Sequence, residues 1–369
     1  MTGIEFNRRL EAIPAYPVAE SYALEGDPSE ATLRGQGELV KLASNESPFG
    51  PAAAVIGAIQ GRLETLNRYP DPSKSALRRA IADRTGVAPG RVTVGNGSCE
   101  ILLAAGDALL EPGAELVYAW PSFSIYPQLA AQSGARAVTV ALDEDACHDL
   151  DAMAREVNAA TRLVIVCNPN NPTATALAIE AIDAFVGGLP RHVLVILDEA
   201  YVEFSLLQDP DDSLDLLARH PNLLLLRTFS KIYGLCGLRV GYALGSERFR
   251  EAIDRVRQPF SVNALAQAAA TEAIRHQDEV ERRVERTAIE RVHVGSELAE
   301  RGLQSTDSQA NFAWVSLGGR DEDRIMQGLA QRGVFVRAGR ALGEEGRLRV
   351  TYGTRPENDA FLAALDQLL

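Results

Sequence analysis

From about residue 90 to residue 245, short apolar runs alternate with longer stretches that have helical spacing. Continuous apolar runs such as Leu163-Val164-Ile165-Val166 are typical of strands buried on both faces of a parallel sheet. Strands separated by helices indicate βαβ units, so the pattern predicts an α/β fold with a mostly parallel seven-stranded sheet sandwiched by helices. The predicted strands are Val92–Val94, Glu115–Ala119, Ala137–Val140, Leu163–Val166, Val193–Leu197, Leu223–Arg227 and Val240–Leu244.

After Asn263 the pattern changes, and it predicts a smaller α+β domain. Its expected elements are a helix from Ala264 to about Arg301, strands at Asn311–Ser316, Val334–Val336 and Arg347–Thr351, and a helix from Arg355 to Leu369. The first 40 or so residues carry several Pro and Gly and predict an irregular arm with a short helix at its start. We therefore expect an arm, 1–44, that contributes to the small domain, a large domain, 45–262, and a small C-terminal domain, 263–369.

Composition narrows the class of protein. The chain has 369 residues, of which 46% are hydrophobic and 24% charged, as in ordinary soluble proteins. A formal net charge of −13 argues against a nucleic-acid partner, because binding to a phosphate backbone depends on clustered Lys and Arg. No apolar run has the length of a signal peptide or a membrane span, and Cys99, Cys147, Cys167 and Cys236 lack metal-ligand spacing. We expect a cytoplasmic protein with free thiols, no metal and no membrane contact.

Polar residues with complementary chemistry follow the predicted strands. Lys231 comes after the strand that ends at Arg227, and Asp198 directly follows the apolar run Val193–Leu197. The Lys231 amine could form a Schiff base, and the Asp198 carboxylate could keep a pyridine nitrogen protonated, which together favour a pyridoxal-phosphate enzyme. Arg239, a nearby cation, would favour the deprotonated amine. Taken singly, Lys231 could be a solvated surface residue, Asp198 a helix cap and Tyr201 a packing residue.

A phosphate site is also indicated. The run Gly95-Asn96-Gly97-Ser98-Cys99-Glu100 opens a predicted helix, whose N-terminal N–H groups attract anions. It lacks the full dinucleotide-binding fingerprint. With the hydroxyls of Thr228 and Ser230 and the guanidinium of Arg239 it would complete a phosphate cup.

Three further residues extend this site. Asn171 lies in a loop stiffened by two X-Pro steps, where its amide could donate to the phenolic oxygen of the cofactor ring. Phe123 follows another strand end and could stack on that ring or simply belong to the core. A substrate carboxylate prefers a bidentate guanidinium, which Arg349 or Arg347 could provide.

Taken together, these motifs resemble the fold-type-I aminotransferases, in particular the histidinol-phosphate aminotransferase family. The similarity extends from Leu42 to Asn358, and its strongest parts are Asn67–Asp71, Cys167–Thr173, Asp198–Tyr201, Arg227–Tyr242 and Gln309–Phe312. Two positions depart from the family pattern: Cys99 replaces a frequent acidic residue, and Ala174 a usual glycine. The segments Leu189–His192, Ser308–Asn311 and Pro259–Val262 look like the related aromatic amino-acid aminotransferases.

The resemblance implies pyridoxal 5′-phosphate as cofactor and a role for each matching residue. Lys231 would form the Schiff base and move the proton between the substrate's α carbon and the cofactor's C4′. Asp198 would pair with the pyridine nitrogen, and Tyr201 and Asn171 with the ring oxygen. The residues implied around the phosphate are Ser98, Cys99, Thr228, Ser230 and Arg239.

The resemblance also implies a homodimer, in which Tyr69 reaches the phosphate of the neighbouring subunit. Arg349 would hold the substrate carboxylate or, together with Arg337, the phosphate of histidinol phosphate, and Tyr16 and Asn45 would line the substrate pocket. The predicted reaction is amino transfer between glutamate/2-oxoglutarate and histidinol phosphate. The alternatives are an aromatic amino acid such as phenylalanine as substrate, or a decarboxylase similar to that for threonine phosphate.

Overall fold

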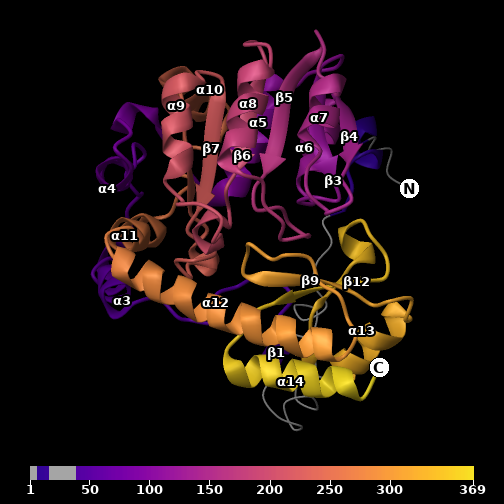
Figure 1. Ribbon diagram of the computed structural model, residues 1–369. Coiled ribbons are helices and arrows are strands. Elements are labelled where there is room, and N and C mark those ends of the chain that lie inside the picture. Colours follow the sequence, from indigo (N-terminus) through magenta and orange to yellow (C-terminus); the bar gives the residue numbers. More distant parts are fainter. Residues whose placement is uncertain (1–5, 16–38) are drawn as a thin grey trace, which may run out of the picture.

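The computed structural model describes residues 6–15 and 39–369, and Figure 1 shows its larger sheet above a smaller unit. The larger sheet has seven strands in the order β2-β8-β7-β6-β5-β3-β4. Strand β8 runs antiparallel to its neighbours β2 and β7, while the other neighbouring pairs are parallel. The strands are β2 Val92–Gly95, β3 Glu115–Trp120, β4 Arg136–Ala141, β5 Thr161–Cys167, β6 Leu194–Asp198, β7 Leu223–Thr228 and β8 Gly241–Leu244. The predicted α/β fold and its seven strands are confirmed.

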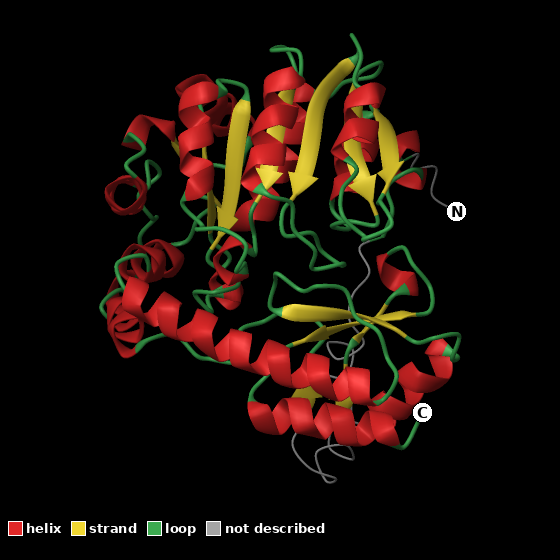
Figure 2. Cartoon of the chain, in the orientation of Figure 1, coloured by secondary structure: helices red, strands yellow, loops and turns green. Residues whose placement is uncertain are grey.

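The larger sheet is buried on both faces, as its apolar runs predict. In β5, Val164 and Val166 belong to one apolar core and Leu163 and Ile165 to another, because successive side chains point to opposite faces. Helices cover these faces and the sheet edges (Figure 2). They are α3 Ala53–Gln60, α4 Ser75–Thr85, α5 Gly97–Leu109, α6 Tyr126–Ser133, α7 Leu150–Glu156, α8 Ile179–Gly188, α9 Leu216–Arg219, α10 Glu247–Val256 and α11 Ala264–Ala273.

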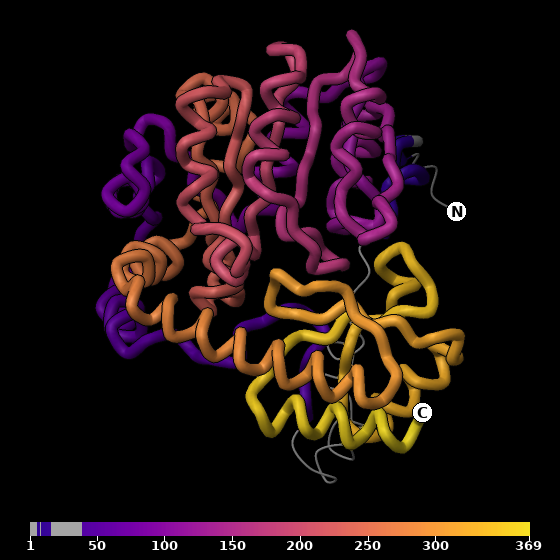
Figure 3. The backbone as a smooth tube through the Cα atoms, in the orientation of Figure 1, coloured from indigo at the N-terminus to yellow at the C-terminus, as the bar shows by residue number. Residues whose placement is uncertain are grey.

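A separate core lies in the smaller unit, where Leu42, Leu298 and Phe361 pack together. Its antiparallel sheet has the order β11-β12-β9, and a two-stranded sheet pairs β1 with β10. The elements are β1 Val40–Lys41, α12 Gln277–Glu300, β9 Phe312–Ser316, α13 Glu322–Gln331, β10 Val334–Phe335, β11 Arg337–Ala338, β12 Arg347–Thr351 and α14 Arg355–Asp366. Figure 3 shows the indigo chain near residue 40 passing into this unit of orange and yellow segments.

Short 3-10 helices complete the described chain: η1 Arg8–Glu11, η2 Leu63–Thr65, η3 Pro89–Arg91, η4 Val202–Phe204, η5 Asp212–Asp215, η6 Cys236–Leu238 and η7 Arg340–Leu342. Of these, η1 matches the short helix expected at the start of the arm. It lies against α6, where the Arg9 guanidinium donates to the Gln132 carbonyl over 3.4 Å.

The single helix predicted from Ala264 to about Arg301 is wrong, because the chain turns between α11 and α12. Ile274 and Val280, on either side of the turn, are both buried in the core of the larger sheet. The Gln277 side chain donates to the Ile274 carbonyl over 2.7 Å and so satisfies one carbonyl at the end of α11. Packing of α11 against α3 and α4 therefore decides its direction, and no Gly or Pro marks the break.

The predicted division into 1–44, 45–262 and 263–369 remains a prediction. Residues Ala266, Ala269 and Ala270 of α11 belong to the larger core, although they follow position 263. Within 6–15 and 39–369, no helix is both long enough and apolar enough to cross a membrane.

The carboxyl ends of β5, β6 and β7 point toward the smaller unit (Figure 2). Ligands bind at this edge of a parallel sheet, since the loops that leave neighbouring strands meet there. Asn171, Asp198 and Lys231 follow or end these three strands, so the fold brings them to one place.

Candidate active site

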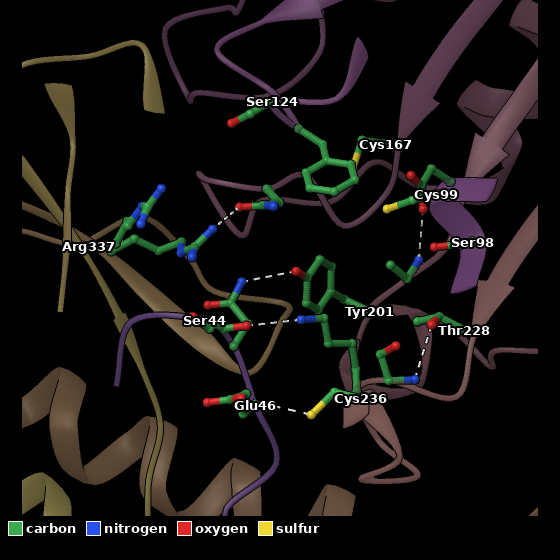
Figure 4. A pocket seen from close by; sticks show the side chains of 18 of the residues that line it. Ser44, Glu46, Ser98, Cys99, Ser124, Cys167, Tyr201, Thr228, Cys236 and Arg337 are labelled. Atoms are coloured by element: carbon green, nitrogen blue, oxygen red, sulfur yellow. Dashed lines mark hydrogen bonds between the residues drawn. The ribbon is translucent and has the colours of Figure 1, made fainter. Parts of the chain in front are cut away.

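A cavity of about 470 Å³ lies at this edge, between the two sheets. It brings together most of the residues predicted for the site, from both units of the chain. In Figure 4, Tyr201 lies in the middle, Arg337 on the side of the small sheet, and Ser98, Cys99 and Thr228 on the opposite side. The predicted residues that line it are Asn45, Ser98, Cys99, Phe123, Asn171, Asp198, Tyr201, Thr228, Ser230, Lys231, Arg239, Arg337 and Arg349.

Lys231 extends into this cavity directly after β7. Its Nζ donates to the Ser44 carbonyl over 3.1 Å and lies 5.6 Å from the centroid of the Tyr201 ring. Burial, and then the cationic Arg349, lower the pKa of the amine to about 8. The like charge that acts on Lys231 is thus mainly Arg349 rather than Arg239, because the small sheet brings a second arginine into the cavity.

Asp198, at the end of β6, is buried with 2% of its surface exposed. The Tyr126 hydroxyl donates to Oδ2 over 2.8 Å, and the Ala200 N–H donates to Oδ1 over 3.2 Å. Burial raises the pKa of the carboxyl to about 6 despite these two donors. A cation placed beside Asp198 would therefore stabilise the ionised carboxylate, which is what a protonated pyridine nitrogen provides.

Glu199, the next residue, belongs to a different network. Its Oε2 accepts from Arg227 Nε over 2.8 Å, and both side chains are buried away from the cavity. This pairing gives Glu199 a structural role.

A hydrogen-bond chain from the small sheet fixes Tyr201. Asn45 Nδ2 donates to the Tyr201 hydroxyl over 3.0 Å, and the Thr351 hydroxyl of β12 donates to Asn45 Oδ1 over 3.2 Å. Burial raises the pKa of the Tyr201 phenol above its ordinary value, so the hydroxyl keeps its proton. Tyr201 can accept from Asn45 and still donate to an oxygen of a ligand.

Arg349 of β12 connects the two units. Its Nη1 donates to Asn171 Oδ1 over 2.6 Å and its Nη2 to the Ala43 carbonyl over 2.7 Å. Arg337 on β11 pairs in register with Arg349, so two guanidinium groups approach the cavity from neighbouring strands. Arg347, the alternative predicted for the carboxylate, instead bonds Glu344 over 2.8 Å and does not line the cavity.

The opposite end of the cavity has the form of an anion cup at the start of α5. A Cβ added at Gly97 would lie 2.5 Å from Arg239 Nη2, and one at Gly241 would lie 2.5 Å from the Ser98 N–H nitrogen. Arg239 Nη1 donates to the Ser230 hydroxyl over 3.4 Å. Both glycines are needed for this close approach, and the donor set of backbone N–H, hydroxyl and guanidinium groups fits a phosphate.

Cys99 lies at this cup without adding negative charge. Burial raises the pKa of its thiol, which keeps the sulfur neutral. A neutral thiol at this position does not repel a phosphate dianion.

Tyr69 does not line the cavity. The Tyr69 side chain is 83% exposed and stacks on Phe260, with ring centroids 4.6 Å apart. Tyr16 lies outside the described residues.

The sequence interpretation missed several residues of the site. Ser44, Glu46, Cys236 and Leu342 line the cavity, and Cys236 Sγ lies 3.9 Å from Glu46 Oε1. Tyr126 was also missed, although it closes the run from Trp120 in which Phe123 was recognised. A phenol three residues beyond a predicted site aromatic is the one signal that could have identified Tyr126.

Comparison with known proteins defines the class. Residues 37–365 match the family model for aminotransferase class I and II. An aromatic amino acid aminotransferase of Cutibacterium acnes is 42% identical over 89% of this chain and 92% of its own length. Histidinol-phosphate aminotransferase 2 of Pseudomonas fluorescens is 41% identical over 97% of this chain and 94% of its own length.

A solved structure of a related aminotransferase has the same fold. The histidinol-phosphate aminotransferase of Sinorhizobium meliloti, in complex with pyridoxal-5′-phosphate, superposes with a TM-score of 0.86 at 29% identity, covering 98% of this chain and 97% of that one. The chain belongs to the class I and II aminotransferases. The prediction of a fold-type-I pyridoxal-phosphate aminotransferase is confirmed.

The first prediction concerns the amine of Lys231. In Arg349→Met the pKa of Lys231 should rise above about 8, because a neighbouring cation is removed. Competitive labelling of the apoprotein with acetic anhydride, followed by peptide mass spectrometry against pH, measures this pKa. Arg347→Met, on the same strand but outside the cavity, should leave it unchanged. An equal rise in both variants would contradict the assignment to Arg349.

The second prediction concerns Asp198. Its folded-state pKa is raised to about 6. Ionisation of Asp198 therefore lowers the free energy of unfolding of the apoprotein as the pH rises from about 4 through 6, and this loss is complete above pH 7. Asp198→Asn removes the buried charge and should stabilise the apoprotein by about 3 kcal/mol at pH 8, but little at pH 4. Urea unfolding at the two pH values measures this difference. The same variant should lose most of its transaminase activity, and a loss of stability at pH 8 would contradict the prediction.

Proposed function

We propose that this chain is a cytoplasmic, homodimeric, pyridoxal-phosphate-dependent aminotransferase that moves an amino group between glutamate/2-oxoglutarate and histidinol phosphate. One observation carries the choice of substrate: Arg337 and Arg349 approach the cavity side by side, opposite the phosphate cup. A substrate with an anionic group distant from its amine suits two adjacent guanidinium groups. The four cysteines are free in the structure, which supports a reducing compartment.

The cofactor supplies an aldehyde for a Schiff base and a ring that withdraws electrons from the substrate. In this proposal Asp198 would hold the ring nitrogen, and Tyr201 and Asn171 would donate to the ring oxygen. Phe123 would pack against the ring. The cup residues that would hold the phosphate are Ser98, Cys99, Thr228, Ser230 and Arg239, all of which line the cavity.

Lys231 then acts on the proton at the substrate's α carbon. With a pKa of about 8, roughly one amine in ten is neutral at pH 7, compared with about one in three thousand for an ordinary lysine. The Ser44 carbonyl, 3.1 Å from Nζ, orients the amine within the cavity. A neutral, oriented amine can take the proton and return it to another carbon.

An aromatic amino acid is the second candidate substrate. Relatives named aromatic amino acid aminotransferase are as similar to this chain as those named for histidinol phosphate, at 42% and 41% identity. Phe123 and Leu342 also give the cavity an apolar part, against which a ring could pack.

Exposed apolar side chains support the proposed homodimer. Ile56, Leu63, Leu66, Tyr69 and Phe260 each expose 39% or more of their surface. All but Phe260 belong to the segment from α3 to the residues after η2, and Phe260 stacks on Tyr69. A group of this kind marks an interaction surface, and the proposal places Tyr69 at the phosphate of the partner subunit.

The third prediction tests the substrate. With glutamate as amino donor, kcat/KM should be higher for imidazole-acetol phosphate than for phenylpyruvate. Arg337→Met should reduce kcat/KM for the phosphorylated acceptor about 10- to 100-fold, because a charge-assisted bond to the phosphate is lost, and change phenylpyruvate turnover little. Lys231→Ala, expected to be inactive, is the control for background reaction. Preference for phenylpyruvate would reverse the ranking, and carbon dioxide release without a keto acid would indicate a decarboxylase.

The fourth prediction tests the dimer. Light scattering should give a mass twice the 39.8 kDa of the chain. Leu66→Asp, which places a charge in the exposed apolar group, should weaken dimerisation at least about 10-fold. Leu207→Asp is the matched control, because Leu207 is similarly exposed, at 54% against 57% for Leu66. A monomeric wild-type protein, or equal dissociation of both variants, would contradict this interface.

A further inference from the structure

A second cavity, of about 390 Å³, lies beside the edge strand β2, between the start of α4, helix α10 and the loop that follows α10. It shares no lining residue with the cavity that contains Lys231. Four cations line it, and one carboxylate: Lys74, Arg78, Arg250, Arg257 and Asp254. For a chain with a net charge of −13, this is an unusual concentration of positive charge.

Lys74 is the residue that most needs an explanation. It is 5% exposed, lines the cavity, and its Nζ has no hydrogen bond or ion pair with any residue in the described parts of the chain. Burial, and then the cationic Arg257, lower the pKa of this amine to about 8. Burial of an ammonium group that makes no hydrogen bond to the protein costs free energy, and the carboxylates of Asp254 and Glu100 offset this cost through space only.

The three arginines are held in place by backbone carbonyls. Arg78 Nε donates to the Pro89 carbonyl over 2.9 Å, and Arg250 Nε donates to the Gly90 carbonyl over 2.9 Å. Arg257 Nη1 donates to the Val94 carbonyl of β2. Carbonyl oxygens orient a guanidinium group without neutralising its charge, so the positive charge at the cavity persists.

Among the described residues, no nearby carboxylate makes a hydrogen bond or ion pair with Lys74. Asp254 bonds Arg250 Nη1 over 2.9 Å and also pairs with Arg257 Nη2, so one carboxylate serves two arginines. Asp254 and then Glu100 act on Lys74 through space only, and Glu100 Oε2 accepts from the Asn96 N–H and the Ser261 hydroxyl. Glu247 acts on Arg78 in the same way. Glu251, 3.5 Å from Arg250 Nη2, is 61% exposed and largely screened by water.

We propose that this cavity is a binding site for a small phosphate-bearing anion, whose oxygens accept hydrogen bonds from Lys74 Nζ and from the guanidinium groups of Arg78 and Arg257. A phosphate dianion matches a cluster of oriented guanidinium groups better than a single carboxylate does, because it offers more charge and more acceptor oxygens. The cavity is larger than inorganic phosphate needs. Val92, Val94 and Phe260 also line it and leave room for a small organic group.

Thermal unfolding of the cofactor-loaded protein tests this site. The buffer contains no phosphate, and inorganic phosphate then replaces chloride at constant ionic strength. The wild-type midpoint should rise by at least about 2 °C at saturating phosphate. Lys74→Met should lose this rise and should have a higher midpoint than wild type without phosphate, because an unpaired buried charge is removed.

Arg79→Met is the matched control. Arg79 lies on α4, which begins directly after Lys74, and its substitution also removes one positive charge. The Arg79 side chain is exposed and does not line the cavity. Arg79→Met should show the same midpoint as wild type and the same rise with phosphate. Any phosphate bound in the Lys231 cavity would raise the midpoint of all three proteins equally. The proposal is wrong if wild type shows no rise, if Lys74→Met keeps the rise seen in Arg79→Met, or if Lys74→Met is less stable than wild type without phosphate.

A crystal of the wild-type holoenzyme soaked in phosphate gives a readout that needs no variant. Density for a tetrahedral anion within hydrogen-bond distance of Lys74 Nζ supports the site. An empty cavity, or an acidic side chain from a second copy of the chain in contact with Lys74, would overturn it.

Discussion

The architecture of the active site depends on ionised groups buried at the carboxyl edge of a parallel sheet. Register places Asp198 of β6 beside Cys167 of β5 and Leu226 of β7, and Lys231 follows β7 by three residues. Burial moves both titrating groups toward neutrality, Asp198 to a pKa of about 6 and Lys231 to about 8. Neither group is well solvated in the apoprotein. A cationic ring nitrogen would stabilise the Asp198 carboxylate, and an aldehyde would bind the Lys231 amine as a Schiff base.

The same site also connects the two units of the chain. The bonds from Arg349 to Asn171 and from Asn45 to Tyr201 join the small sheet and the segment before it to loops of the large sheet. Apolar contact joins the units as well, since Phe312 of β9 belongs to the larger core and its ring centroid lies 5.1 Å from that of Tyr201. A ligand that competes for Asn171, Tyr201 or Arg349 therefore acts directly on part of the contact between the units.

Much of this could be predicted from the sequence, because continuous apolar runs locate the strands and polar motifs follow them. Prediction was poorest where tertiary contacts decide the outcome. The break between α11 and α12 follows from packing, the strand β1 has only two residues, and the bond from Tyr126 to Asp198 forms only in the folded chain. Ala174 illustrates a departure that the fold accommodates: it adopts φ 61°, the left-handed region that favours the family's usual glycine, in a fully buried position.

The two cavities differ in how their cations are compensated, and this difference indicates what each one lacks. Arg349 has an amide and a carbonyl as partners, and Lys231 has the Ser44 carbonyl. Lys74 is 5% exposed and makes no hydrogen bond to a described residue, and Asp254 and Glu100 act on it through space only. A position that served packing alone would favour an apolar side chain of the same length, since methionine fills the volume without the desolvation cost. An anion in the cavity would give the ammonium group the hydrogen-bond partner that the described residues do not supply, and the proposed anion site follows from this difference.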